Sequence, residues 1–114
     1  MNLHEAVVEI KKALPELHEA MNENGSLYYN SMGAFARFTQ DQIDSRELKK
    51  LKLCFSLARD FLMNGDENLK NAMHVSYLEH LNFEDSKRNH RSYAFDLMLP
   101  PLRQAYRNIM DYLK

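Results

Sequence analysis

Apolar residues recur every three or four positions through most of the chain, which is the spacing of one face of an α-helix. The first such stripe covers residues 3–21 in a heptad rhythm, and Pro15 removes a backbone donor in its middle. We therefore expect this helix to kink there, or to break at Leu14 with Pro15 opening a second short helix. The stripe consists of Leu3, Val7, Ile10, Leu14, Leu17 and Met21.

Two further stripes predict helices over residues 27–39 and 48–63, separated by the polar stretch 39–45. Asp44 followed by Glu47 resembles a capping box, in which a side chain accepts a free backbone amide at the start of a helix. We expect this box to open the second of the two helices.

The segment 69–81 carries apolar residues on every side of a helical wheel, so we expect it at the centre of the fold. Asp66 is the expected N-cap, and the predicted helix spans 66–82. A Glu79 carboxylate buried there requires a donor, for which an arginine is the natural choice. The polar residues assigned a structural part are Glu79, Asn71 and Ser76, and the candidate donors are Arg37, Arg59 and Arg103.

The region after the central helix begins with a polar stretch at residues 83–91 that has no periodicity and is predicted to be an exposed loop. Ser92 can cap a short helix that runs through Met98. The pair Pro100-Pro101 ends it, since a residue before proline is pushed out of the helical conformation, and a last helix follows.

Composition supports a helical domain. The length of 114 residues fits one domain, 1–114, that buries a core without a metal or a disulfide. Only three Gly and three Pro are present, and there is no Trp, which favours helices over a sheet rich in turns. We predict an all-α fold, either a bundle or a short α-α superhelix, with about five to six helices around the buried central helix 66–82.

Charge and cysteine usage narrow the function classes. The single cysteine, Cys54, excludes an internal disulfide and fits a reducing compartment, so we expect a cytoplasmic protein without a signal peptide or membrane span. The net charge of −1 argues against nucleic acid as a partner. Residues 1–47 hold eight acids and four bases, whereas residues 48–114 hold eight acids and eleven bases. The fold could therefore have two surfaces of opposite charge, or the two halves of the chain could mix so that their charges are interspersed.

A search for reactive groups predicts no catalytic, cofactor-binding or metal-binding residues. Histidine and carboxylate motifs with metal-ligand spacing on a helix are absent, and His80 with Glu84 is the nearest approach. Cys54 lies inside an apolar helix, where burial raises the pKa of a thiol and makes it inert. We therefore expect a protein that is not an enzyme.

Two charged groups are candidate partner-binding surfaces. Lys87, Arg88 and Arg91 form a basic cluster in the predicted loop, and a contact with an acidic protein surface is favoured there over a nucleic acid. Glu16, Glu19 and Glu23 fall on one helix face and would meet a basic partner. The alternative for each group is an ordinary solvated surface.

Several segments resemble landmarks of small bacterial helical proteins of uncharacterised function. They are Gly65-Asp66 through Asn71-Ala72, Ser76-Tyr77-Leu78-Glu79-His80-Leu81, Gly33-Ala34-Phe35-Ala36-Arg37-Phe38, and Leu97-Met98-Leu99-Pro100 through Leu102-Arg103. Tyr77 stands where such proteins more often have Phe. Several families of this kind are similar to immunity proteins encoded beside polymorphic or contact-dependent toxins. The resemblance therefore implies a protein that acts by binding and has no chemistry of its own.

We predict a protein-binding domain, an immunity protein that neutralises a cognate toxin domain by direct binding. An alternative from another class is an enzyme or small-molecule-binding protein with an aromatic pocket between its helices. A homo-oligomer that pairs through the stripe over residues 3–21 is a third hypothesis. The aromatic pocket would be lined by Tyr28, Tyr29, Phe35, Tyr77, Tyr106 and His74.

Overall fold

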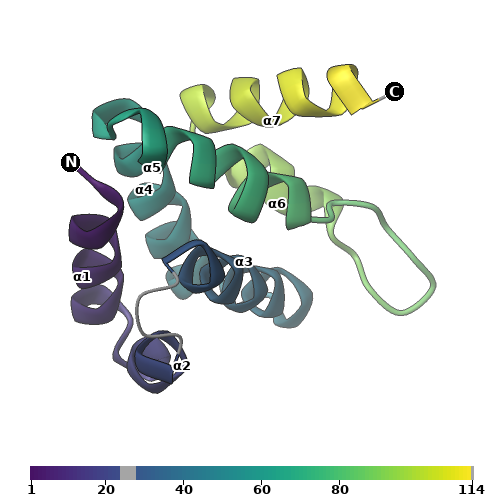
Figure 1. Ribbon diagram of the computed structural model, residues 1–114. Coiled ribbons are helices and arrows are strands. Elements are labelled where there is room, and N and C mark those ends of the chain that lie inside the picture. Colours follow the sequence, from purple (N-terminus) through teal and green to yellow (C-terminus); the bar gives the residue numbers. More distant parts are fainter. Residues whose placement is uncertain (24–27, 114) are drawn as a thin grey trace.

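The computed structural model describes the backbone of residues 1–23 and 28–113, and the side chains of residues 1–21 and 31–113. Within these residues the chain forms seven α-helices and three short turns of 3-10 or π-helix, and it has no strand (Figure 1). The predicted all-α fold is confirmed, with seven α-helices where about five to six were expected.

The helices pack around one apolar core. α1 contacts α3, α4 and α5, while α7 contacts α4 and the later turns of the central segment. The elements in chain order are α1 (Leu3–Ala13), η1 (Pro15–Leu17), α2 (His18–Glu23), α3 (Tyr28–Ser45), α4 (Leu48–Asn64), α5 (Glu67–Ala72), η2 (Met73–Tyr77), η3 (Leu78–His80), α6 (Ser92–Leu97) and α7 (Pro100–Leu113).

The first helix ends where the sequence predicts. α1 stops at Ala13, Leu14 leaves the helical conformation with φ −127° and ψ 77°, and Pro15 opens the 3-10 turn η1. The break at Leu14 is therefore confirmed, because proline cannot supply the amide that would continue the helix. The stripe over residues 3–21 packs into this chain's own core, apart from a partly buried Leu3. That packing removes the basis for an oligomer formed through the stripe.

The central segment runs through three helix types and contacts α1, α3, α4 and α7. Asp66 caps its start as predicted, since its carboxylate accepts the Leu69 amide at 2.9 Å. The prediction that this segment is buried on every side is wrong, however, because Val75 is 46% exposed. The residues that do face the core are Leu69, Ala72, Met73, Tyr77, Leu78 and Leu81.

The prediction of an ion pair between Glu79 and an arginine is also wrong. Glu79 is exposed and lies on the open side of the segment with Asn71 and Val75, at intervals of four residues, while Ser76 is partly buried. The ion pairs among the described residues do not include Glu79. A carboxylate in water needs no arginine, because bulk solvent already satisfies it.

α3 is longer than predicted, since it continues through residues 39–45, which are polar apart from the fully buried Ile43. The capping box at Asp44 is wrong. Glu47 is the N-cap residue of α4 and makes no side-chain cap, while Asp44 lies within α3 and points to a different partner. The last two turns of α3 thus carry polar side chains that are free to bind another segment.

Candidate partner-binding surface

The predicted acidic surface of Glu16, Glu19 and Glu23 does not present three free carboxylates. Glu16 forms an ion pair with Lys50 of α4, and this hydrogen bond lowers the pKa of the Glu16 carboxyl and raises that of Lys50. Glu19 is exposed, and the side chain of Glu23 lies outside the described residues. This surface therefore offers one free acid among its described residues.

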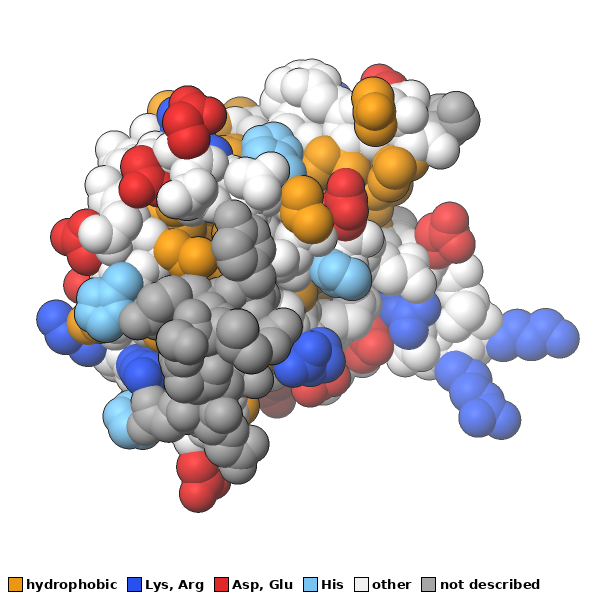
Figure 2. All heavy atoms as spheres, in the orientation of Figure 1, with side chains coloured by type: hydrophobic (Ala, Val, Ile, Leu, Met, Phe, Trp, Pro, Cys, Tyr) orange, Lys and Arg blue, Asp and Glu red, His pale blue; other side chains and the backbone are white. Residues whose placement is uncertain are grey.

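The predicted basic group divides in two. Arg91 turns inward, where its side chain is 17% exposed and its Nε donates to Asp44 Oδ1 at 2.7 Å. Its Nη2 donates to the other carboxylate oxygen at 3.3 Å, so the contact is bidentate. Lys87 and Arg88 stay exposed near the tip of the loop that joins η3 to α6. Figure 2 shows basic side chains projecting from this loop, well clear of the rest of the surface.

Both ends of this loop, residues 82–91, are fastened to the last turns of α3. At the start, the Asn82 amide donates to Gln40 Oε1 at 2.8 Å, and Gln40 Nε2 donates back to the Asn82 carbonyl at 3.1 Å. At the end, Arg91 binds Asp44. Gln40 Nε2 also donates to Asp44 Oδ1, at 3.1 Å, which joins the two anchors into one network. The 82–91 loop is thus closed at its base by two residues one helical turn apart.

The upper part of the 82–91 loop is ordered by its own polar groups. The Ser86 amide donates to the Asn89 carbonyl at 2.8 Å, and the Asn89 amide donates to Ser86 Oγ at 3.1 Å. The Asp85 carboxylate accepts the backbone amides of Arg91 and Ser92, and these bonds together with that of the Ser92 hydroxyl lower the pKa of Asp85. Lys87 and Arg88 near the tip therefore belong to a loop whose backbone is hydrogen-bonded at several points.

Beside the base of the loop, α3 and η3 enclose a hollow of about 280 Å³, lined by Gly33, Arg37, Gln40 and His80, which we call the Arg37 hollow. Arg37 is exposed and has no ion-pair partner among the described residues. Its guanidinium lies over Gly33, with Nη1 3.5 Å from the place a Cβ would occupy. The hollow therefore presents an unneutralised cation next to the Gln40 anchor.

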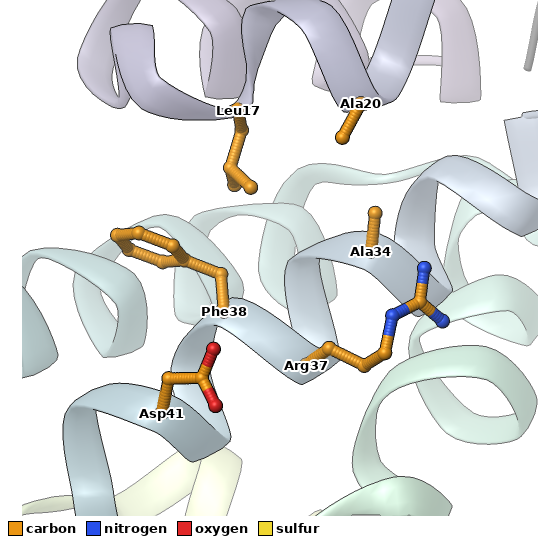
Figure 3. Close-up of a pocket in the computed structure, with 6 residues that line it drawn as sticks. All are labelled: Leu17, Ala20, Ala34, Arg37, Phe38 and Asp41. Atoms are coloured by element: carbon orange, nitrogen blue, oxygen red, sulfur yellow. The ribbon is translucent and has the colours of Figure 1, made fainter. Parts of the chain in front are cut away.

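A second hollow of about 190 Å³ lies on the other side of Arg37, between α2 and α3. Leu17 and Ala20 point across the gap toward Ala34 and Phe38, while Arg37 and Asp41 stand at the rim (Figure 3). Small side chains at Ala20 and Ala34 leave the space open. The two hollows make this side of α3 uneven, so a partner that packs closely here would have to match that shape.

The residues that build this surface were partly missed by sequence reasoning. Gln40 and Asp44 lie in a stretch that the apolar pattern places between helices, and Arg37 is predicted as a candidate partner for Glu79. Their spacing of three and four residues is the one available signal, because it places all three on neighbouring turns of a helix. That signal has meaning only once the stretch is known to be helical.

The aromatic pocket predicted as an alternative site is not formed by its described members. Phe35 and Tyr77 are fully buried and stack on each other with ring centroids 4.7 Å apart. Tyr106 instead contacts Phe83 edge to face, at 5.0 Å, and His74 is partly buried. Tyr28 and Tyr29 lie outside the residues whose side chains are described. These rings fill the interior rather than line a cavity.

No cluster of three or more His, Cys, Asp or Glu side chains among the described residues is arranged to hold a metal ion. None of the helices described is both long and apolar enough to pass through a membrane.

Comparison with known proteins yields one match. A family model described as a domain of unknown function (DUF7674) matches residues 7–114. No curated protein and no solved structure matches the chain. The family description names no activity or partner, so the resemblance to toxin-immunity proteins gains no support from this match.

Proposed function

This chain belongs to the DUF7674 family, a domain of unknown function, and from its surface we propose that it is a non-enzymatic protein-binding domain. The 82–91 loop docks on an acidic surface of the partner, with Lys87 and Arg88 as the contacting cations. One observation carries this proposal: the base of the loop is fixed to α3, while neither cation has an ion-pair partner among the described residues.

Order in the loop favours tight binding. A flexible segment loses conformational entropy when it binds, and a segment that is already held in place loses less. The hydrogen bonds to Gln40 and Asp44 already restrict the loop in the folded protein, so less conformational entropy is lost on binding. Lys87 and Arg88 are then presented on an ordered backbone, where they steer an acidic partner during encounter.

The Arg37 hollow extends the same surface. Gln40 both lines this hollow and holds the start of the loop, so the two features adjoin. Arg37 offers a planar donor fork that suits a carboxylate, and His80 lies across the hollow from it. A partner with one acid in this hollow and others against the loop tip would match the distribution of charge.

The partner we propose is a bacterial toxin domain that this protein neutralises by covering it. The resemblance to immunity proteins and the small size support this choice of partner. The toxin domain is expected to be acidic where it meets the 82–91 loop, because that loop is the projecting basic feature of this face (Figure 2).

The test uses the domain encoded by the gene beside this one, purified and mixed with this protein in a calorimeter. We expect a complex with equal amounts of both proteins and loss of the domain's toxicity. Lys87→Glu with Arg88→Glu should weaken binding by at least about tenfold, since two attractive charges become repulsive. Higher salt should also weaken the wild-type complex, because exposed charges are screened.

A matched control reverses two exposed lysines elsewhere, with Lys12→Glu and Lys49→Glu. This control changes net charge by the same amount and should leave the affinity within about twofold of wild type. Equal weakening by both double variants would show attraction by net charge alone and would reject the loop as the docking element. Absence of any complex, with toxicity unchanged, would reject the proposed function itself.

A further inference from the structure

A cleft of about 360 Å³ lies between α4 and the connection from α6 to α7, and its residues are distinct from those of the partner-binding surface. Its residues on α4 are spaced by three and four, so they occupy one face of that helix. The lining consists of Lys52, Phe55, Ser56 and Arg59 on one side and Leu97 and Leu99 on the other.

The cleft has apolar walls and a charged rim. Phe55 is buried, and Leu97 and Leu99 are partly buried, so the walls are apolar. Lys52 and Arg59 stand seven residues apart on α4, about 10 Å along its axis, with the Ser56 hydroxyl between them. The described lining residues therefore include two cations and no acid.

The cations are available to a ligand. Lys52 is exposed and has no ion-pair partner among the residues described. Arg59 contacts the adjacent Asp60 with 3.4 Å between Nη2 and Oδ1, and both side chains are more than 40% exposed in that pair. An exposed contact of this length contributes little, so most donors of the guanidinium remain free.

The leucine wall is held in place by Arg103 of α7. Its Nη2 donates to the carbonyls of Asp96 and Met98, at 3.1 and 2.9 Å, on either side of Leu97. The guanidinium also lies 5.7 Å from the centre of the Phe95 ring. Arg103 therefore holds the connection between α6 and α7 in position, and the cleft is formed without a ligand.

We propose that this cleft binds a small amphipathic carboxylate. The carboxylate lies over Ser56, accepts its hydroxyl and takes charge-assisted contacts from Lys52 and Arg59. The hydrocarbon part packs on Phe55, Leu97 and Leu99. A volume of about 360 Å³ lies at the small end of ligand sites and suits a chain of medium length better than a bulky molecule.

The test titrates the whole protein with decanoate, octanoate and hexanoate, and with decanol as an uncharged probe of matched length. Binding is followed by amide chemical shifts in nuclear magnetic resonance spectra. We expect saturable shifts at Ser56, Leu97 and Leu99, and an affinity that rises roughly twofold to fourfold for each added methylene. Decanol should bind more weakly than decanoate, because it lacks the charge.

Variants separate charge from apolar contact. Lys52→Gln with Arg59→Gln should weaken decanoate binding about fivefold and decanol binding much less, since the uncharged hydroxyl of decanol forms no ion pair with either cation. Lys12→Gln with Lys49→Gln removes two cations elsewhere and should have no effect. The proposal is overturned if decanoate causes no saturable shifts, if the shifts lie outside the cleft, or if the two double variants behave alike.

Discussion

Tyr77 Oη lies 3.0 Å from Thr39 Oγ1, and both side chains are fully buried. Thr39 uses its own hydrogen to donate to the Phe35 carbonyl at 2.9 Å, so the Tyr77 hydroxyl is the donor between the two. This pair joins α3 to the π-helical turn η2 within an otherwise apolar core. It gives the central segment a fixed position along α3.

The Thr39 and Tyr77 pair predicts an asymmetry between single substitutions. Thr39→Val leaves a buried Tyr77 hydroxyl without an acceptor and should cost about 1–3 kcal/mol of unfolding free energy. Tyr77→Phe leaves Thr39 donating to the Phe35 carbonyl and should cost only about 1 kcal/mol. Urea denaturation measures both values, and the double variant should be more stable than the sum predicts. Equal costs for the two single variants would contradict this account.

The Asp44 and Arg91 pair predicts a dependence of stability on pH. The hydrogen bond from Arg91 is the largest cause of the lowered pKa of the Asp44 carboxyl. A carboxyl with a lowered pKa in the folded state stabilises that state above its ordinary value of 3.8 and loses this effect as pH falls below it. Asp44→Asn should therefore lower the Tm at pH 7, with the difference from wild type shrinking below about pH 4. Thermal melts followed by circular dichroism across this range provide the measurement, and a constant difference would contradict it.

The two described glycines should respond to alanine in opposite directions. A Cβ on Gly65 would lie 2.4 Å from the Phe61 carbonyl oxygen and 2.9 Å from the Leu69 side chain, so Gly65→Ala should destabilise by about 1–3 kcal/mol. A Cβ on Gly33, inside α3, would meet only Arg37 Nη1 at an ordinary 3.5 Å. Gly33→Ala should raise stability by about 0.5–1 kcal/mol through helix propensity. Denaturant midpoints of the two variants on opposite sides of wild type would confirm the prediction.

Cys54 should resist thiol reagents in the folded protein. Burial raises the pKa of this thiol to about 11. At pH 8 the thiolate is then scarce as well as inaccessible, and an aromatic disulfide reagent should react only after denaturant unfolds the chain. Absorbance of the released thiol gives the rate. Fast reaction at low denaturant would show that α4 opens locally around this residue.

Glu79 should be dispensable for stability. The helical wheel alone predicts a buried carboxylate paired with an arginine, but the side chain is exposed. Glu79→Ala should therefore change the free energy of unfolding by no more than about 0.5 kcal/mol. A thermal melt against Met73→Ala, which removes a fully buried side chain and should cost about 2–5 kcal/mol, gives the scale. A large loss for Glu79→Ala would point to a partner that the fold does not show.

Local features of the sequence determined where α1 ends and where α5 begins. Pro15 ends α1 because proline lacks an amide, and Asp66 opens α5 because its carboxylate accepts one. The stretch at residues 83–91 forms a loop as predicted, since no apolar period runs through it, but Phe83 at its start is buried in the core. Each of these signals acts within a few residues, so one sequence is enough to carry it.

The tertiary structure alone decided which polar groups meet. α3 continues through residues 39–45, where Gln40 and Asp44 bind Asn82 and Arg91, more than forty positions away in the chain. The same placement turned Arg91 from a candidate contact into an anchor and left Lys87 and Arg88 facing water. Periodicity fixes the spacing of side chains along an element, whereas the partner of a charge depends on how separate elements pack, and no short-range pattern encodes that.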